Sequence, residues 1–136
     1  MFLTVSVEKP ENAANVCRPL TQLAAVRANY ARLAAKRRER DNGRLAARMA
    51  LCELPCDEQG RVAFAPRRYR IIWPFKGSRP DADNIVARMN HVLDGCAMAF
   101  GIDDRDLELE GVERCRITHS NPNNYAKTHV YIRFSD

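Results

Sequence analysis

Four aspartates in the second half of the chain have the spacing of a possible metal site. Asp81 and Asp83 stand two residues apart, and Asp103 and Asp104 are adjacent. Mg²⁺ prefers carboxylate oxygens, and two or three carboxylates with retained waters and a substrate phosphate form a usual site. Such an ion polarises a phosphate and activates a water. Spacing alone fits helix caps and turns equally well, so other observations must decide between these interpretations.

The charge of the chain is distributed unevenly around these aspartates. Between Arg18 and Arg79 there are 15 Lys/Arg and 5 Asp/Glu, whereas between Asp81 and Asp136 there are 6 Lys/Arg and 10 Asp/Glu. Basic surface attracts nucleic acid. Clustered carboxylates beside it would repel phosphate unless a cation stands between them. This combination is the first indication of a metal-dependent nuclease.

The first half of the chain predicts a strand followed by helix. Phe2–Glu8 alternates apolar and polar residues, which indicates a half-buried strand. Pro19 suits the first turn of a helix. Apolar residues then recur at helical spacing, at Leu20, Leu23, Val26, Tyr30 and Leu33. Asp41-Asn42-Gly43 predicts an interruption or a cap. A second helical segment runs from Arg44 to about Leu54, so the sequence leaves open one kinked helix or two.

The second half predicts strands around one further helix. Arg61–Ala65 indicates a short strand, and the β-branched and aromatic residues of Tyr69–Phe75 indicate a central one. A helix follows from Asp81, with Ile85, Met89, Val92, Leu93 and Cys96 on its buried face and Gly95 as the point where it ends or loosens. Leu109–Thr118 and Thr128–Phe134 are expected to pair as a hairpin. Residues 1–136 therefore form a single α/β (α+β) domain with a mixed sheet and helices packed on it.

The cysteines and the apolar segments exclude several classes of protein. The chain has five cysteines, at positions 17, 52, 56, 96 and 115. Their scattered spacing is not that of a disulfide framework. Cys52 and Cys56 lack the second ligand pair that a structural zinc site needs. No apolar run is long enough to span a bilayer, and no secretory signal is evident. We therefore expect a cytoplasmic protein with free thiols and no membrane partner.

One stretch of the sequence resembles a known family. Arg79-Pro80-Asp81-Ala82-Asp83-Asn84-Ile85 precedes a helix with Leu93-Asp94-Gly95, and Gly101-Ile102-Asp103-Asp104 follows it. This order resembles the RusA family of Holliday junction resolvases, which is typical of prophages. The resemblance covers about Tyr69 to Leu107, where residue identities and element types agree together. Elsewhere only layout and size agree.

The resemblance implies a homodimeric Mg²⁺-dependent endonuclease, with Mn²⁺ as an alternative ion, that resolves four-way DNA junctions by paired nicks. Asp81, Asp83 and Asp104 fall on the family's catalytic, metal-binding carboxylates. Asp103 is a less favoured ligand, and Asn84 supports the site. With DNA as the partner, we expect phosphate contacts from basic residues near the site and on the first helix, namely Lys76, Arg79, Arg88, Lys36, Arg37, Arg38 and Arg40.

The sequence departs from the family in two ways: the gap between Asp83 and Asp103 is slightly longer than expected, and the residue at one position differs. The family usually carries a lysine four residues after the second aspartate, where this chain has Ala87. Lys76, Arg79 or Arg88 would have to supply that cation, and arginine does not replace lysine fully near a reacting phosphate. Two alternatives therefore stay open. One is a non-catalytic DNA-binding module that keeps the resolvase fold, and the other is a basic face that binds an acidic protein.

Overall fold

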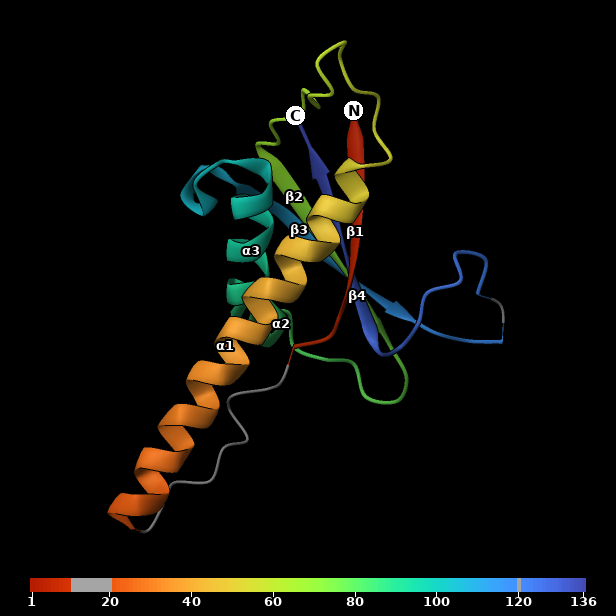
Figure 1. Cartoon of the computed structure of the whole chain (residues 1–136). Coiled ribbons are helices and arrows are strands. Elements are labelled where there is room, and N and C mark those ends of the chain that lie inside the picture. Colours follow the sequence, from red (N-terminus) through yellow and green to blue (C-terminus); the bar gives the residue numbers. More distant parts are fainter. Residues whose placement is uncertain (11–20, 120) are drawn as a thin grey trace.

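The computed structural model describes residues 1–10, 21–119 and 121–136. Its elements follow the order β1 (Phe2–Glu8), α1 (Gln22–Leu51), β2 (Arg68–Phe75), α2 (Ala82–Arg88), α3 (Asn90–Phe100), the 3₁₀ helix η2 (Asp104–Asp106), β3 (Glu108–Arg116) and β4 (His129–Ser135). Figure 1 shows α1 lying across the sheet and extending well beyond it. The predicted helix start at Pro19 and Leu20, and Cys17 as a free thiol, lie outside the described residues.

The four strands form one mixed sheet in the order β1-β4-β2-β3. β4 is antiparallel to both β1 and β2, whereas β3 is parallel to β2. The predicted hairpin between the last two strands is therefore wrong, because β2 lies between β3 and β4. The α2–α3 segment connects the parallel strands β2 and β3, as a crossover must. The expected single α+β domain with a mixed sheet and packed helices is confirmed.

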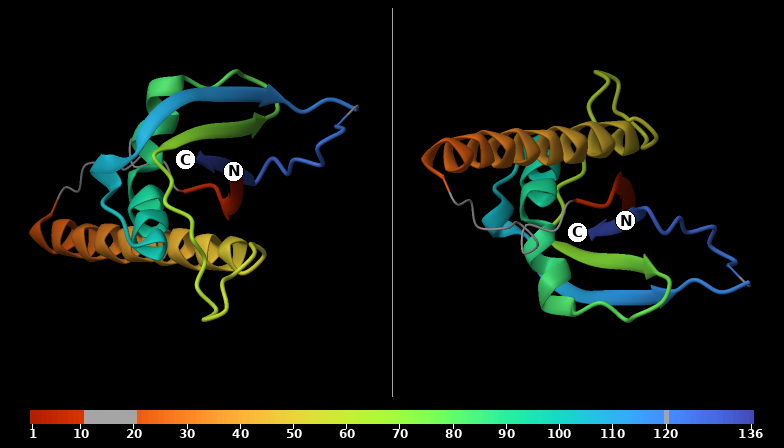
Figure 2. Two further views of the ribbon diagram at one scale, coloured as in Figure 1. Left: turned by 90° about the horizontal axis from the view of Figure 1, so that it is seen from above. Right: turned by 90° about the horizontal axis from the view of Figure 1, so that it is seen from below.

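The core lies between the helices and one face of the sheet. Alternate residues of β1, including Val5 and Val7, join Ile71 and Trp73 of β2 and Ile85 of α2 in one buried cluster. The alternation in β1 places its other residues on the opposite face. The end-on views of Figure 2 show α1 on one side of the strands. The sheet therefore has one face packed against helices and one face without them.

Helix α1 is continuous through Gly43, where the sequence predicted an interruption or a cap. Its second half packs against α3 at two glycines. An added Cβ at Gly43 would lie 2.3 Å from Val92 O, and one at Gly95 would lie 1.9 Å from Arg40 O. The two backbones therefore meet where neither helix has a side chain. Gly95 does not loosen α3 but is buried inside it. The helix break instead falls at Met89, between α2 and α3.

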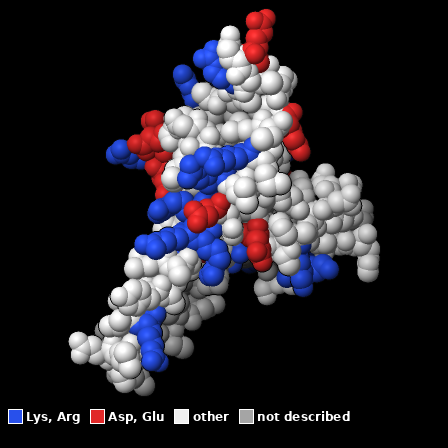
Figure 3. All heavy atoms as spheres, in the orientation of Figure 1, with Lys and Arg blue, Asp and Glu red and all other residues white. Residues whose placement is uncertain are grey.

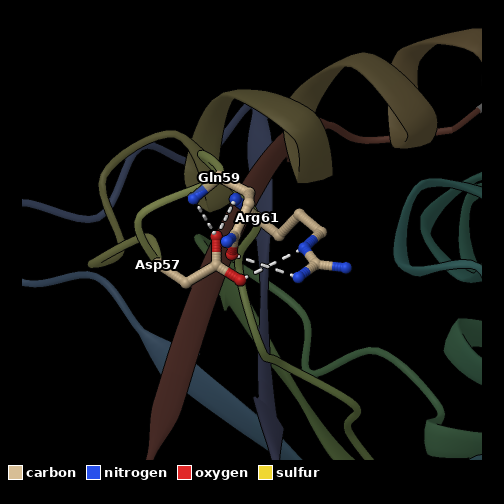
Figure 4. A network of polar contacts seen from close by, with 3 residues as sticks. All are labelled: Asp57, Gln59 and Arg61. Atoms are coloured by element: carbon tan, nitrogen blue, oxygen red, sulfur yellow. Dashed lines mark hydrogen bonds and ion pairs between the residues drawn. The ribbon is translucent and has the colours of Figure 1, made fainter.

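The connection between α1 and β2 contains a turn but no strand. Asp57 Oδ1 accepts hydrogen bonds from Gln59 N at 3.0 Å and Arg61 N at 2.7 Å, and its Oδ2 lies 3.2 Å from Arg61 Nε (Figure 4). Gly60 has the positive φ of 74° that this turn requires. The predicted strand Arg61–Ala65 is wrong. Those residues pair with no strand, although Phe64 is buried in the core.

A candidate metal site at the carboxyl end of the sheet

Asp81 and Asp83 lie together just beyond the carboxyl end of β2. Asp81 is the N-cap of α2, and its Oδ1 accepts a hydrogen bond from Asp83 N at 3.1 Å. Its backbone oxygen accepts the helical hydrogen bond from Ile85 N. Asp83 occupies the first turn of α2, and both carboxylates are exposed. The N-cap interpretation of Asp81 is therefore confirmed, and its Oδ2 is the oxygen that can bind a cation.

Two arginines of β3 hold the loop that delivers Asp81. Arg114 Nη1 donates to Pro80 O at 3.1 Å, and Arg116 Nη1 donates to Gly77 O at 2.7 Å. The Arg116 guanidinium also lies 4.8 Å from the centre of the Phe75 ring. Gly77 has a φ of 80°, which favours glycine at this bend. Sequence reasoning missed both arginines, because only the parallel pairing of β2 and β3 brings them to this loop.

Asp103 and Asp104 lie at the opposite end of the sheet, where β3 begins. Asp103 is the N-cap of η2 and forms an ion pair with Arg105 at 2.9 Å. The Arg105 hydrogen bonds hold the pKa of Asp103 well below its usual range. The hydrogen bond that the protonated Asp104 carboxyl donates to Asp103, together with desolvation and the charge of Asp94, raises the pKa of Asp104. Burial raises the pKa of Tyr69, near the start of β2, and the charge of Asp104 raises it further.

Within one chain, Asp81 and Asp83 therefore lie together, whereas Asp104 lies away from them. Helix α3 alone contributes 11 residues to the intervening segment, a rise of about 16 Å. The sequence prediction allowed the chain to turn back between Gly95 and Gly101, but this stretch is helical until Gly101 caps it at a φ of 71°. Among the residues described, no three His, Cys, Asp or Glu side chains gather closely enough to hold a metal ion.

The three cations predicted near the site, Lys76, Arg79 and Arg88, differ in their exposure. Lys76 and Arg79 are exposed in the loop before Asp81, and Asn84 is exposed on α2. Arg88 is half-buried because its Nε and Nη2 donate to Pro10 O and its guanidinium lies 4.8 Å from the Trp73 ring centre. Arg88 is thus directed at the sheet. Trp73 and Phe75 are buried core residues.

The basic cluster Lys36–Arg40 lies on the middle of α1. Lys36, Arg37 and Arg38 are exposed, whereas Arg40 Nε is 2.9 Å from Asp94 Oδ2 of α3. Arg38 lines a hollow of about 140 Å³ together with Lys9 and Pro10, which follow β1. The shared hollow places the cluster near the carboxyl end of β1, which is also the Asp81 end of β2. Figure 3 shows Lys and Arg side chains gathered over this part of α1.

Lys9 is a further cation at this end that sequence reasoning missed. Its Nζ donates to Pro74 O and lies 4.6 Å from the Trp73 ring centre, on which Arg88 also packs. Burial lowers the pKa of Lys9, and the charges of Arg88 and Lys127 lower it further. No sequence signal could have identified Lys9, because its position depends on the long-range pairing of β1 with β4.

The described charges differ between the two ends of the sheet. Around the first residues of β2 and β3, the carboxylates Asp103, Asp104, Asp106, Glu108 and Glu110 stand beside the cations Arg67, Arg68, Arg70 and Arg105. At the carboxyl end of β2, the carboxylates Glu8, Glu39, Asp81, Asp83 and Glu113 stand among the cations Lys9, Lys76, Arg79, Arg88, Arg114, Arg116 and Lys127. A polyanion would be attracted to the second end.

No family model matches the chain, and no curated protein matches it. Within the described residues, no helix is both long and apolar enough to cross a membrane.

Proposed function

We propose that this chain is a Mg²⁺-dependent endonuclease that acts on branched DNA, with four-way junctions as its substrate. The observation that carries the proposal is the exposed Asp81–Asp83 pair among the cations at the carboxyl end of β2. The resemblance of Tyr69–Leu107 to the RusA family supports the same assignment. Phosphate groups would approach this end under electrostatic attraction and meet the two carboxylates there.

The donor set fits a hard cation. Asp81 and Asp83 offer exposed carboxylate oxygens at a helix start, which suits Mg²⁺ or Mn²⁺ with retained waters. A bound ion would polarise the scissile phosphate and activate a water. Asp81 and Asp83 would bind the metal ion. The hydrogen bond from Arg114 to Pro80 O fixes the loop that carries Asp81, and Lys76 and Arg79 would attract the DNA backbone.

Asp104 would join this site from a second copy of the chain. Because Asp104 lies at the far end of α3, it can reach the Asp81–Asp83 pair only from another molecule. A two-fold symmetric dimer uses the same surface on both copies, so each copy would give Asp81 and Asp83 to one site and Asp104 to the other. Such a dimer would carry two sites, which paired nicking of opposed strands requires.

Cleavage and binding should separate in Asp83→Asn. The variant is expected to lose metal-dependent nicking and to keep its affinity for a four-way junction, or to bind more tightly, because a negative charge beside the phosphates is removed. Asp106→Asn is the matched control, since Asp106 is an exposed aspartate of η2 outside the proposed ligand set. Loss of junction binding together with cleavage in Asp83→Asn would contradict the assignment.

Mixing two inactive variants tests the shared site. Asp83→Asn and Asp104→Asn should each be inactive alone. In a mixed dimer, one site has an intact Asp81–Asp83 pair from one copy and an intact Asp104 from the other, so nicking of single strands should return. If mixing restores no activity although the two variants exchange subunits, the two ligand groups do not meet across an interface.

A second candidate function is a DNA-binding module without catalysis. Ala87 is exposed where the family lysine is expected, and the neighbouring Arg88 is committed to Pro10 and Trp73. This alternative predicts salt-dependent binding of DNA that ignores Mg²⁺, and no cuts in any divalent metal.

A further inference from the structure

The face of the sheet opposite the helices carries a cationic row between two aromatic groups. Register partners define the rows. Thr4, Arg133 and Arg70 are opposite one another on β1, β4 and β2. Phe2 stands two residues before Thr4, and Tyr131 stands two residues before Arg133. We call the surface formed by Phe2, Arg70, Tyr131 and Arg133 the open face.

The positive charges of the two arginines at the centre of the open face, Arg70 and Arg133, are not fully balanced by nearby carboxylates. Arg70 and Arg133 are directly opposite in register, and like charges in that relation destabilise a sheet. Arg70 approaches Glu110 at 4.0 Å, but Arg68 shares the same carboxylate at 3.8 Å. Among the described residues, no carboxylate lies within ion-pair distance of Arg133, and Glu8 and Glu113 stand in other rows of this face. An anion between the two guanidinium groups would relieve their repulsion.

Aromatic rings flank this pair along the strand direction. Phe2 is 69% exposed, and the Arg133 guanidinium lies 5.9 Å from its ring centre. On the other side, the Tyr125 and Tyr131 ring centres are 4.7 Å apart, and Tyr131 Oη accepts a hydrogen bond from Ala126 N. The Phe2 and Tyr131 rows are four residues apart on β1, which corresponds to about 13 Å.

We propose that the open face binds single-stranded nucleic acid. One base would stack on Phe2, another on the Tyr125–Tyr131 pair, and the phosphates between them would contact Arg70 and Arg133. Aromatic side chains on a sheet face that carries no helix are a common platform for unpaired bases, and arginine adds charge and stacking. Duplex DNA does not fit this arrangement, because its bases are already stacked. The binding requires no metal, so it does not depend on the proposed nuclease activity.

The test is fluorescence anisotropy with a dye-labelled 12-nucleotide oligo-dT and a duplex of equal length, both in EDTA. Phe2→Leu keeps an apolar side chain and removes only the ring. We expect it to weaken oligo-dT binding about tenfold and to leave duplex binding unchanged, since stacking makes a contribution of that order for each base. Arg133→Gln should weaken oligo-dT binding and reduce the slope against log salt by about 0.7. Arg133→Lys should restore that slope.

Arg48→Gln is the matched control, because Arg48 is an exposed arginine on α1, in the helix layer. The proposal is overturned if the protein does not bind oligo-dT, if Phe2→Leu and Arg133→Gln stay within twofold of the unsubstituted protein, or if Arg48→Gln weakens binding as much as they do. Equal weakening of oligo-dT and duplex binding by Phe2→Leu would also overturn it. Phe2 is exposed, so Phe2→Leu should fold even if a change at Arg133 impairs folding.

Discussion

Replacing Gly95 with alanine should destabilise the protein strongly, because α1 and α3 meet backbone to backbone there. The added Cβ would lie 1.9 Å from Arg40 O, 2.8 Å from Arg40 C and 2.9 Å from Arg44 N. All three atoms belong to the backbone, so no side chain can rotate away. The helices would have to separate by more than about 1 Å, and this separation would loosen the packing around Cys96 and Met89 as well.

The expected magnitude follows from two opposing terms. Overpacking a close-packed contact costs typically about 1–3 kcal/mol and occasionally more, and a clash between backbones that cannot rotate away belongs just above that range, at about 4 kcal/mol. Alanine returns about 1 kcal/mol of helix propensity relative to glycine. A clash of about 4 kcal/mol therefore leaves a net loss of about 3 kcal/mol in the free energy of unfolding. For a domain of this size that corresponds to a fall of about 10 °C in Tm.

Urea unfolding followed by circular dichroism measures this loss. The control is Gly111→Ala in β3, because a Cβ there would meet no atom within 4 Å. We expect the control to remain within about 0.5 kcal/mol of the unsubstituted protein, as surface changes usually do. If Gly95→Ala is also within that range, the close approach of α1 and α3 is refuted. The fixed position of the basic cluster relative to Asp81 and Asp83 would then be lost with it.

Three further predictions concern Gly43, the cysteine thiols and the contact between Asp103 and Arg105. Gly43→Ala should destabilise for the same reason as Gly95→Ala, because its Cβ would lie 2.3 Å from Val92 O; a free energy of unfolding equal to that of Gly111→Ala would contradict this. In alkylation at pH 8, Cys52 and Cys56 are exposed and should react at once. Burial raises the pKa of Cys96 to about 12, so Cys96 should react only after unfolding; its rapid labelling would show that the core opens. The Arg105 hydrogen bonds depress the pKa of Asp103, so the stability this contact gives is present above the ordinary aspartate pKa and is lost as pH falls through the depressed value. Arg105→Gln should raise the Asp103 pKa toward its ordinary range in an NMR titration, and an unchanged value would show that Arg105 is not the cause of the depression.

The sequence predicted an element correctly where its local pattern and its tertiary environment favour the same structure. The β-branched and aromatic residues of Tyr69–Phe75 predicted a buried strand, and the structure has one at Arg68–Phe75. The alternation in Phe2–Glu8 predicted a half-buried strand with the same bounds. The residue type and position of Asp81 made a helix cap one of its two interpretations, and Asp81 does cap α2.

The errors arose where distant segments decide the outcome. Gly43 and Gly95 indicated helix breaks, because glycine is a weak helix former and the approach of another backbone leaves no local signal. The order of strands depends on the crossover that places β3 beside β2, so the predicted hairpin failed. The separation of Asp104 from Asp81 and Asp83 has the same origin, since α3 runs unbroken through Gly95 and carries the chain to the other end of the sheet.

A nicking assay on a synthetic four-way junction tests the central claim most directly, with a linear duplex as control and with EDTA, Mg²⁺ or Mn²⁺ in parallel. The proposed function predicts paired cuts near the junction centre that require the metal and are absent on the duplex and in Asp83→Asn. Tight junction binding without cuts in either metal would contradict it and favour the non-catalytic module, with Ala87 in place of the family lysine as the first cause to examine.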